Sequence, residues 1–273
     1  MKKYNIASRV AMSIIGLLIF TTLGFGQDSN EFTVPLSDPA KRAKLKAVIN
    51  FGSVTVKGTA RKDVLVKYSA SKDDDDDRNQ TKNGLRRIGG GGMDLEVTEN
   101  GNTVTVHSGS WSNKLNIEIE VPAGTDVEAK THNDGDLTVS NINGEAVLTN
   151  HNGEIKALNM SGSVIATTYN GEIKVSLDKV KEDTPMSFTT YNGDVDITFP
   201  ASMKATLKMK TERGDIFSDF DVAFKNTGPV KKTDTNAGVY KVVIDEWKRG
   251  DINGGGPEVT LRNYNGDIFV RKR

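Results

Sequence analysis

The sequence predicts an all-β protein, an elongated parallel β-solenoid (β-helix-like) with coils of about 18–22 residues. Three observations predict this class. Glycines recur every nine residues from Gly135 to Gly171, apolar residues follow each of them two and four positions later, and Asn-Gly-Glu-Ile-Lys occurs at both 152–156 and 170–174. Because alternation with a period of two is typical of strands with one buried face, the repeat predicts stacked strands and not helices.

The repeating unit has two kinds of corner. Residues 151–154 (His-Asn-Gly-Glu) resemble residues 169–172 (Tyr-Asn-Gly-Glu), whereas 141–144 and 159–162 share a different pattern. One full coil therefore spans eighteen residues, with two strands and two corners. Asn-Gly suits a corner without any ligand, because glycine adopts positive φ freely and asparagine tolerates the left-handed region. Related corners follow at 191–194, 212–215 and 264–268, and an early one lies at 50–56.

A single coil cannot bury its own apolar face. Stacked coils can, because each aliphatic side chain then lies on its counterpart one coil away, as we expect for Ile155 and Ile173. Burying such a side chain contributes about 1.5–3 kcal/mol, against a backbone ordering cost of about 1–2 kcal/mol per residue. We therefore expect the stack to fold cooperatively.

Residues 1–26 are predicted to be a secretory signal peptide, which leaves 27–273 as a single β-solenoid domain. A positively charged start precedes an apolar run at 10–20, and small residues at 24–26 offer a cleavage site. The run is shorter than the roughly 20 residues that a membrane anchor needs. We expect an exported protein of the periplasm, cell envelope or extracellular space, without a membrane span after signal cleavage.

Regularity varies along this domain. The most regular repeats lie at 131–220, a final repeat lies at 257–273, and a polar Asp/Gly-rich loop is inserted at 71–92. Less regular strands are expected within 44–68, 93–106 and 114–121.

Charge and composition exclude several classes of protein and site. The chain has 36 basic and 36 acidic residues, and residues 1–26 contain three cations and no anions, so the remainder carries 33 − 36 = −3. This near-neutral charge argues against a nucleic-acid binder, which would carry a basic stripe. There is no cysteine, which excludes disulfides, thiolate metal sites and cysteine nucleophiles.

The repeats and their flanks resemble a known bacterial family. The matching residues are the Asn-Gly-Glu/Asp-Ile corners of 133–197 and the segments 178–220 and 252–273, together with the looser "GLRRIGGGG" and "VPAGTDVEAKTHNDGDLTVS". The chain resembles the "putative adhesin" family of exported β-strand-repeat domains of unknown function. The resemblance implies a parallel β-solenoid at the cell envelope and brings no catalytic residues.

Calcium is one candidate ligand, because some nonapeptide repeats bind it through Gly-Gly-x-Gly-x-Asp turns. Here each corner has a single glycine, and the acidic position varies: Asp136, Glu145, Glu154, Ser163, Glu172. The alternative is that these side chains point into solvent beside Lys156 and Lys174. The acidic run Asp73–Asp77 is interpreted as a solvated loop. We expect no metal site and no cofactor.

A glycan-active β-helix enzyme, either a lyase or a hydrolase, is the alternative from another class. Hydrolases need two carboxylates at a defined separation, but the acids here follow the repeat. His107, His132 and His151 do not have the spacing of a metal site, and no nucleophile elbow, zinc-protease motif or phosphate loop is present. We therefore expect no catalytic residues and no enzyme activity.

Aromatic residues occupy one position of the similar corners: His151, Tyr169, Tyr191 and Tyr264. They predict either a ladder of rings that covers the solenoid edge or a surface on which sugar rings or a partner stack. The function predicted is that of a non-catalytic, adhesin-like envelope scaffold that binds a cell surface, a glycan or a protein. An envelope-stress accessory factor without a ligand is a further alternative.

Overall fold

The computed structural model describes residues 30–70, 81–82, 85–86, 94–180, 184–225, 230–234, 241–245 and 247–273. The predicted signal peptide at 1–26 lies outside these residues. So does most of the predicted loop at 71–92, including the acidic run, apart from the short antiparallel strands β5 (Thr81–Lys82) and β6 (Leu85–Arg86).

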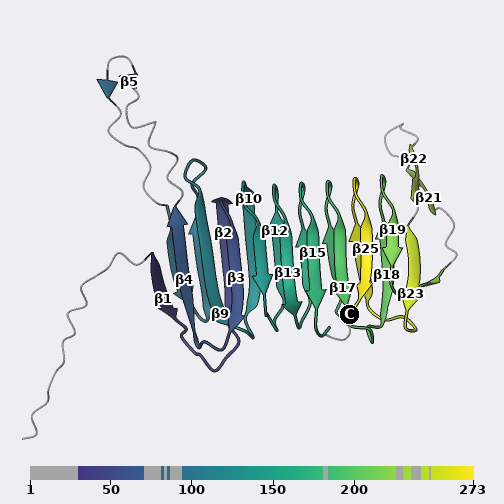
Figure 1. Cartoon of the computed structure of the whole chain (residues 1–273), viewed down its shortest axis with the longest axis horizontal. Helices are drawn as coiled ribbons and strands as arrows, with labels where there is room; N and C mark the ends of the chain where they lie inside the picture. Colours follow the sequence, from purple (N-terminus) through teal and green to yellow (C-terminus); the bar gives the residue numbers. More distant parts are fainter. Residues whose placement is uncertain are drawn as a thin grey trace, which may run out of the picture.

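The described chain folds into two large sheets and contains no helix among its described residues. The first sheet has the spatial order β1 (Glu31–Pro35), β4 (Asp63–Ala70), β9 (Leu115–Pro122), β3 (Val54–Thr59), β11 (Leu137–Ser140), β13 (Ile155–Met160), β15 (Ile173–Leu177), β17 (Val195–Phe199), β25 (Ile268–Lys272) and β19 (Ile216–Ser218). The second has the order β20 (Ala223–Phe224), β23 (Lys248–Ile252), β18 (Ala205–Lys210), β24 (Glu258–Arg262), β16 (Met186–Thr189), β14 (Val164–Thr167), β12 (Ala146–Asn150), β10 (Asp126–Asn133), β2 (Lys44–Phe51), β8 (Thr103–Ser108) and β7 (Glu96–Asn100). A separate pair is formed by β21 (Val230–Asp234) and β22 (Lys241–Asp245). Figure 1 shows the strands side by side along the long axis of the molecule.

The core lies between the two sheets. Alternate residues of each central strand are buried, as in β17, where Val195, Ile197 and Phe199 are inaccessible to solvent. All buried apolar side chains of the described residues belong to one continuous cluster. The period-two alternation in the sequence is therefore the pattern that builds this core.

The chain alternates between the sheets in the middle of the molecule, so that one strand of each sheet forms a coil. Ile155 on β13 lies opposite Ile173 on β15, and Ile173 lies opposite Val195 on β17, all in parallel register. Ile155 and Ile173 are both fully buried. The predicted pile of aliphatic side chains from coil to coil is confirmed.

The sheets are mixed, which corrects the expectation of a wholly parallel fold. Parallel pairing holds through the middle coils, but β1–β4, β4–β9, β7–β8 and β18–β23 are antiparallel. Two adjacent strands joined by a tight turn must run antiparallel, and β7 is joined to β8 by only Gly101 and Asn102. The antiparallel strands lie toward the two ends of the stack, where the regular repeat stops.

The coils do not follow each other in space in chain order. The last coil, β24/β25, lies between β16/β17 and β18/β19, and its yellow strand β25 stands among green ones in Figure 1. The early coil β2/β3 likewise lies between β8/β9 and β10/β11. Toward each end of the stack, therefore, one coil lies between two coils that do not precede or follow it directly in the chain.

Candidate functional site

The similar corners are built around glycines that approach one another closely. Gly153, Gly171 and Gly193 have φ values of 149°, 152° and 133°, which side chains rarely adopt. A Cβ atom on Gly171 would overlap the carbonyl oxygen of Gly153, and one on Gly193 would overlap that of Gly171. The repeat of glycine is therefore a packing requirement of the corner.

Buried hydroxyls and amides hold these glycines in place. Thr168 Oγ1 donates to the Gly153 carbonyl at 3.1 Å, and Thr190 Oγ1 donates to the Gly171 carbonyl at 2.9 Å. Asn150 and Asn263 donate in the same way through Nδ2. Each corner is thus bound to its neighbour by a side chain that sequence reasoning did not single out.

A ladder of asparagine side chains runs beside the glycines. Asn170 Nδ2 donates to Asn152 Oδ1 at 2.8 Å, Asn192 Nδ2 donates to Asn170 Oδ1 at 2.7 Å, and Asn265 continues to Asn192 at 2.6 Å. Such a ladder satisfies both ends of each amide between coils. The Asn-Gly corner is explained by the fold without any ligand.

Outside the asparagines lies an aromatic ladder, which we define as Trp111, His132, His151, Tyr169, Tyr191 and Tyr264. Its successive ring centroids are 5.1, 4.6, 5.3, 4.9 and 4.7 Å apart. The planes of Tyr169, Tyr191 and Tyr264 are parallel to within 2°. The guanidinium of Arg213 lies 5.5 Å from the Tyr264 centroid and continues the stack.

This geometry limits what the ladder can bind. The faces of Tyr169 and Tyr191 are covered by neighbouring rings, so their exposed fractions of 46% and 40% belong to ring edges and hydroxyls. Sugar rings cannot stack on covered faces. The ladder covers the solenoid edge, and what it offers a ligand is a row of polar edges.

His132 and Trp111 join the ladder although their spacing from the corner glycine does not match. His132 precedes Gly135 by three residues and not by two, because Asp134 is an extra corner residue with φ 48°. His132 nonetheless stacks on His151, with 8° between the planes. His107, the third histidine weighed as a possible metal ligand, lies on β8 outside the ladder. The sequence signal for His132 is the three-residue His-Asn-Asp lead into glycine.

The corner acids have structural partners. Asp136 Oδ1 accepts the backbone N–H of Glu154 at 2.9 Å, and Asp126 accepts that of Glu145 at 2.8 Å. Glu154 forms an ion pair with Lys156. Burial, followed by the nearby charge of Glu154, raises the pKa of Glu172 above its ordinary range. Ser163 is buried.

No three His, Asp or Glu side chains within the described ranges come together in a way that would hold a metal ion. The calcium alternative therefore has no converging set of carboxylates among the described corner residues.

A groove of about 290 Å³ lies between the ladder and the outer face of the second sheet. Its lining includes Thr167, Thr189 and Arg262 from the sheet, Tyr169, Tyr191 and Tyr264 from the ladder, and Glu212. Thr167, Thr189 and Arg262 lie side by side in register on β14, β16 and β24. The groove therefore presents hydroxyls, ring edges and one guanidinium on a rigid surface.

A comparison with protein families gives a match that includes part of the aromatic ladder. The family model for Toastrack DUF4097 matches residues 131–253. The family resemblance inferred from the sequence is confirmed, and the family is one of unknown function. The Toastrack match includes most of the ladder but ends before β24 and Tyr264.

Two solved structures are similar to the chain. One is a "putative cell adhesion protein" from Clostridium sporogenes, with 12% identity, a TM-score of 0.47, and coverage of 89% of this chain and 99% of that one. The other is a "putative adhesin" from Bacteroides fragilis, with 11% identity, a TM-score of 0.35, and coverage of 89% and 96%. The chain matches none of the curated proteins.

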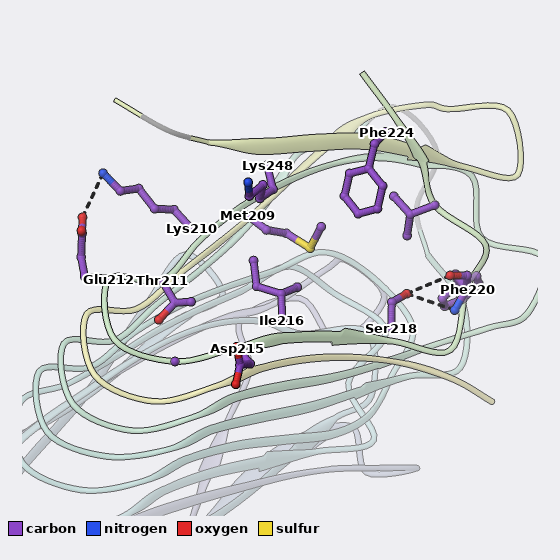
Figure 2. Close-up of a pocket in the computed structure, with 12 residues that line it drawn as sticks. Met209, Lys210, Thr211, Glu212, Asp215, Ile216, Ser218, Phe220, Phe224 and Lys248 are labelled. Atoms are coloured by element: carbon purple, nitrogen blue, oxygen red, sulfur yellow. Dashed lines mark hydrogen bonds and ion pairs between the residues drawn. The ribbon is translucent and has the colours of Figure 1, made fainter. Parts of the chain in front are cut away.

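A larger cleft, of about 800 Å³, opens at one end of the stack (Figure 2). The first sheet stops at β19, while the second continues through β23 and β20. Met209 on β18 and Ile216 on β19 line the cleft with Phe224, which is 64% exposed. Its apolar lining is the core side of the coil β18/β19, on which no further complete coil of the described residues is stacked. We therefore interpret this cleft as a feature of the end of the stack and not as a binding site.

The structure contains no candidate membrane span in its described part, since no helix there has the necessary length and apolar character.

Proposed function

We propose that this protein is a non-catalytic, exported scaffold of the cell envelope, a rigid two-sheet β-solenoid that binds a surface partner. The groove beside the aromatic ladder is the binding face. The observation that carries the proposal is the combination of exposed hydroxyls and ring edges with a ladder of asparagine hydrogen bonds beneath them. A binding surface held by such ladders loses little conformational entropy when a partner binds.

The rigidity of this face follows from the bonds below it. Asn170 and Asn192 are bonded to the coils on both sides, and the glycines next to them lie so close together that no side chain fits between the coils. Among the corner acids, Asp136 accepts a backbone N–H and Glu154 forms an ion pair with Lys156. A binding role fits this arrangement better than acid–base catalysis, which needs carboxylates placed for substrate.

The test compares variants of the ladder for binding to native cells and cell-envelope polysaccharides. The first variant is the chain without its predicted signal peptide, with Tyr169→Phe and Tyr191→Phe together. This double substitution keeps both rings and removes both hydroxyls. We expect unchanged thermal stability and at least about a fivefold loss of binding, since each neutral hydrogen bond contributes roughly 0.5–1.5 kcal/mol. The matched control is Phe217→Ala, in the exposed aromatic pair of the first sheet with Phe269.

Two outcomes would overturn the proposal. If Tyr169→Ala with Tyr191→Ala lowers stability while binding stays unchanged, the ladder is only a structural cover. If the wild-type protein releases reducing ends or unsaturated products from a polysaccharide, the protein is an enzyme and the non-catalytic assignment is wrong.

A further inference from the structure

We propose that the groove binds a carboxylate-bearing sugar residue of an acidic polysaccharide, with Arg262 as the anion-binding group. This inference rests on the proposed function and names the class of ligand for the same face. It starts from one unusual feature of the groove, a guanidinium that forms no ion pair with any carboxylate of the described residues.

Arg262 lies on the outer face of the second sheet. It is the last residue of β24, opposite Thr189 on β16 and Lys210 on β18. Its side chain is exposed, and in the part of the chain that the structure describes no carboxylate lies within ion-pair distance of it. Its planar fork of donors is therefore available for a bidentate contact with a carboxylate.

The nearest acid in the groove is already engaged. Glu212 forms an ion pair with Lys210 at 2.9 Å. Arg213 adds a second guanidinium at this end, stacked on Tyr264. Two guanidinium groups and one carboxylate are thus the charged groups that Arg262, Arg213 and Glu212 bring to this end of the groove, a balance that favours an anion.

The remaining lining is neutral and rich in hydroxyls. Thr167 and Thr189 extend from Arg262 along one row of the sheet, and Thr149 continues that row on β12. The hydroxyls of Tyr169 and Tyr191 lie on the ladder side. Neutral donors and acceptors at strand spacing, about 4.8 Å apart, match the hydroxyls of a sugar chain. An acidic peptide would instead favour apolar pockets for alternate side chains.

The other end of the same row supplies a matched control. Lys130 on β10 is in register with Thr149, four strands from Arg262, which places it about 19 Å away. Lys130→Gln removes the same charge as Arg262→Gln and leaves the groove intact. Non-specific attraction to the net charge would be weakened equally by both substitutions.

The experiment is calorimetric titration with tetragalacturonate and with its carboxyl-reduced, neutral counterpart. We expect wild-type protein to bind the acidic form at least about tenfold more tightly than the neutral form. Arg262→Gln should lose about tenfold or more in affinity for the acidic form, whereas Lys130→Gln should change it by less than about twofold. Unchanged melting temperatures would show that both variants fold.

Equal binding of the two oligosaccharides, or equal affinity of wild type and Arg262→Gln, would overturn the inference. So would a preference for an acidic peptide of the same charge. If the protein binds cells through the tyrosine face but not tetragalacturonate, the proposed function stands and the assignment of an acidic glycan falls. If the Phe variants bind cells normally while Arg262→Gln loses the oligosaccharide, the groove binds an acidic glycan, but the proposed role of the tyrosine face in binding cells falls.

Discussion

Single residues at the corners decide how closely the coils can stack. Gly171 has both a positive φ and no room for a Cβ atom, and Thr190 donates to its carbonyl from the next coil. Asn170 fills the neighbouring position with a bond to each side. The corner is thus a set of small, mutually dependent positions, and its residues are fixed by packing more strongly than the solvent-facing residues of the strands.

Gly171→Ala should destabilise the protein by roughly 2–4 kcal/mol, because the methyl group both overlaps the Gly153 carbonyl and strains the backbone. Chemical denaturation measures the change. Gly124→Ala is the control, since a Cβ there meets no atom within 4 Å, and its effect should stay within about 0.5 kcal/mol. Equal effects of the two substitutions would contradict the close approach at the corner.

The histidine end of the ladder should make stability depend on pH. Burial, followed by the charges of His151 and Lys130, holds the pKa of His132 below its ordinary value of 6.5. The folded state then binds a proton less readily than the unfolded chain. The stability contributed by neutral His132 is therefore present above about pH 6.5 and is lost as the pH falls below it.

His132→Phe keeps a stacking ring and removes the titration. Unfolding free energies of wild type and variant, measured between about pH 7.5 and 5.5, should diverge as the pH falls, with the steeper loss in wild type. The raised pKa of Glu172 acts in the opposite direction in both proteins and cancels in the difference. Parallel curves would show that His132 is not shielded by the stack.

At the scale of the strand, the two faces of one sheet have separate tasks. On β12 and β14 of the second sheet, the inward residues Leu148 and Ala166 belong to the core, while the outward residues Ile165 and Val147 remain 42% and 44% exposed. Adjacent strands are locked in parallel register by these inward side chains, because a slip of one residue would turn them to solvent. Strand stability is thus carried by one half of the residues.

A matched pair of isoleucines tests this division. Ile173→Ala should cost about 2–5 kcal/mol, because a fully buried side chain leaves a cavity in the pile. Ile165→Ala, on β14 of the opposite sheet and facing outward, should cost less than about 1 kcal/mol. Urea unfolding measures both. Similar losses would mean that the outer face is buried by something other than this sheet.

Across the whole molecule, the sequence predicts the coil but not the order of the coils. Alternation and corner spacing identify Ile155 and Ile173 as neighbours, which the register confirms. They carry no information about where the last coil inserts, since any coil presents an equivalent pair of edges. The insertion depends on long connections, and the antiparallel end strands depend on local turns such as Gly101-Asn102.

The candidate site was predictable only in part, because the repeat pattern does not specify the order of the coils in space. Corner spacing identifies Tyr169 and Tyr191, but the stacking of their faces follows from the distance between coils. Arg262 follows no motif, and its place beside Thr189 exists only because β24 lies against β16. The groove is a product of the coil order.

The position of the last coil leads to a prediction about truncation. Deleting residues 254–273 leaves the Toastrack match complete but removes β24 and β25 from inside the stack. β19 pairs with β25 and with no other described strand, so the segment 205–224 should lose its protection. We expect limited proteolysis to cleave there while 126–199 stays protected, and the urea m-value to fall as less surface is buried. The control removes only residues 271–273, whose exposed ion pairs contribute little. A full m-value and an uncut 205–224 after the longer deletion would mean that β16/β17 and β18/β19 close the gap by pairing directly, and that the inserted coil is dispensable for the fold.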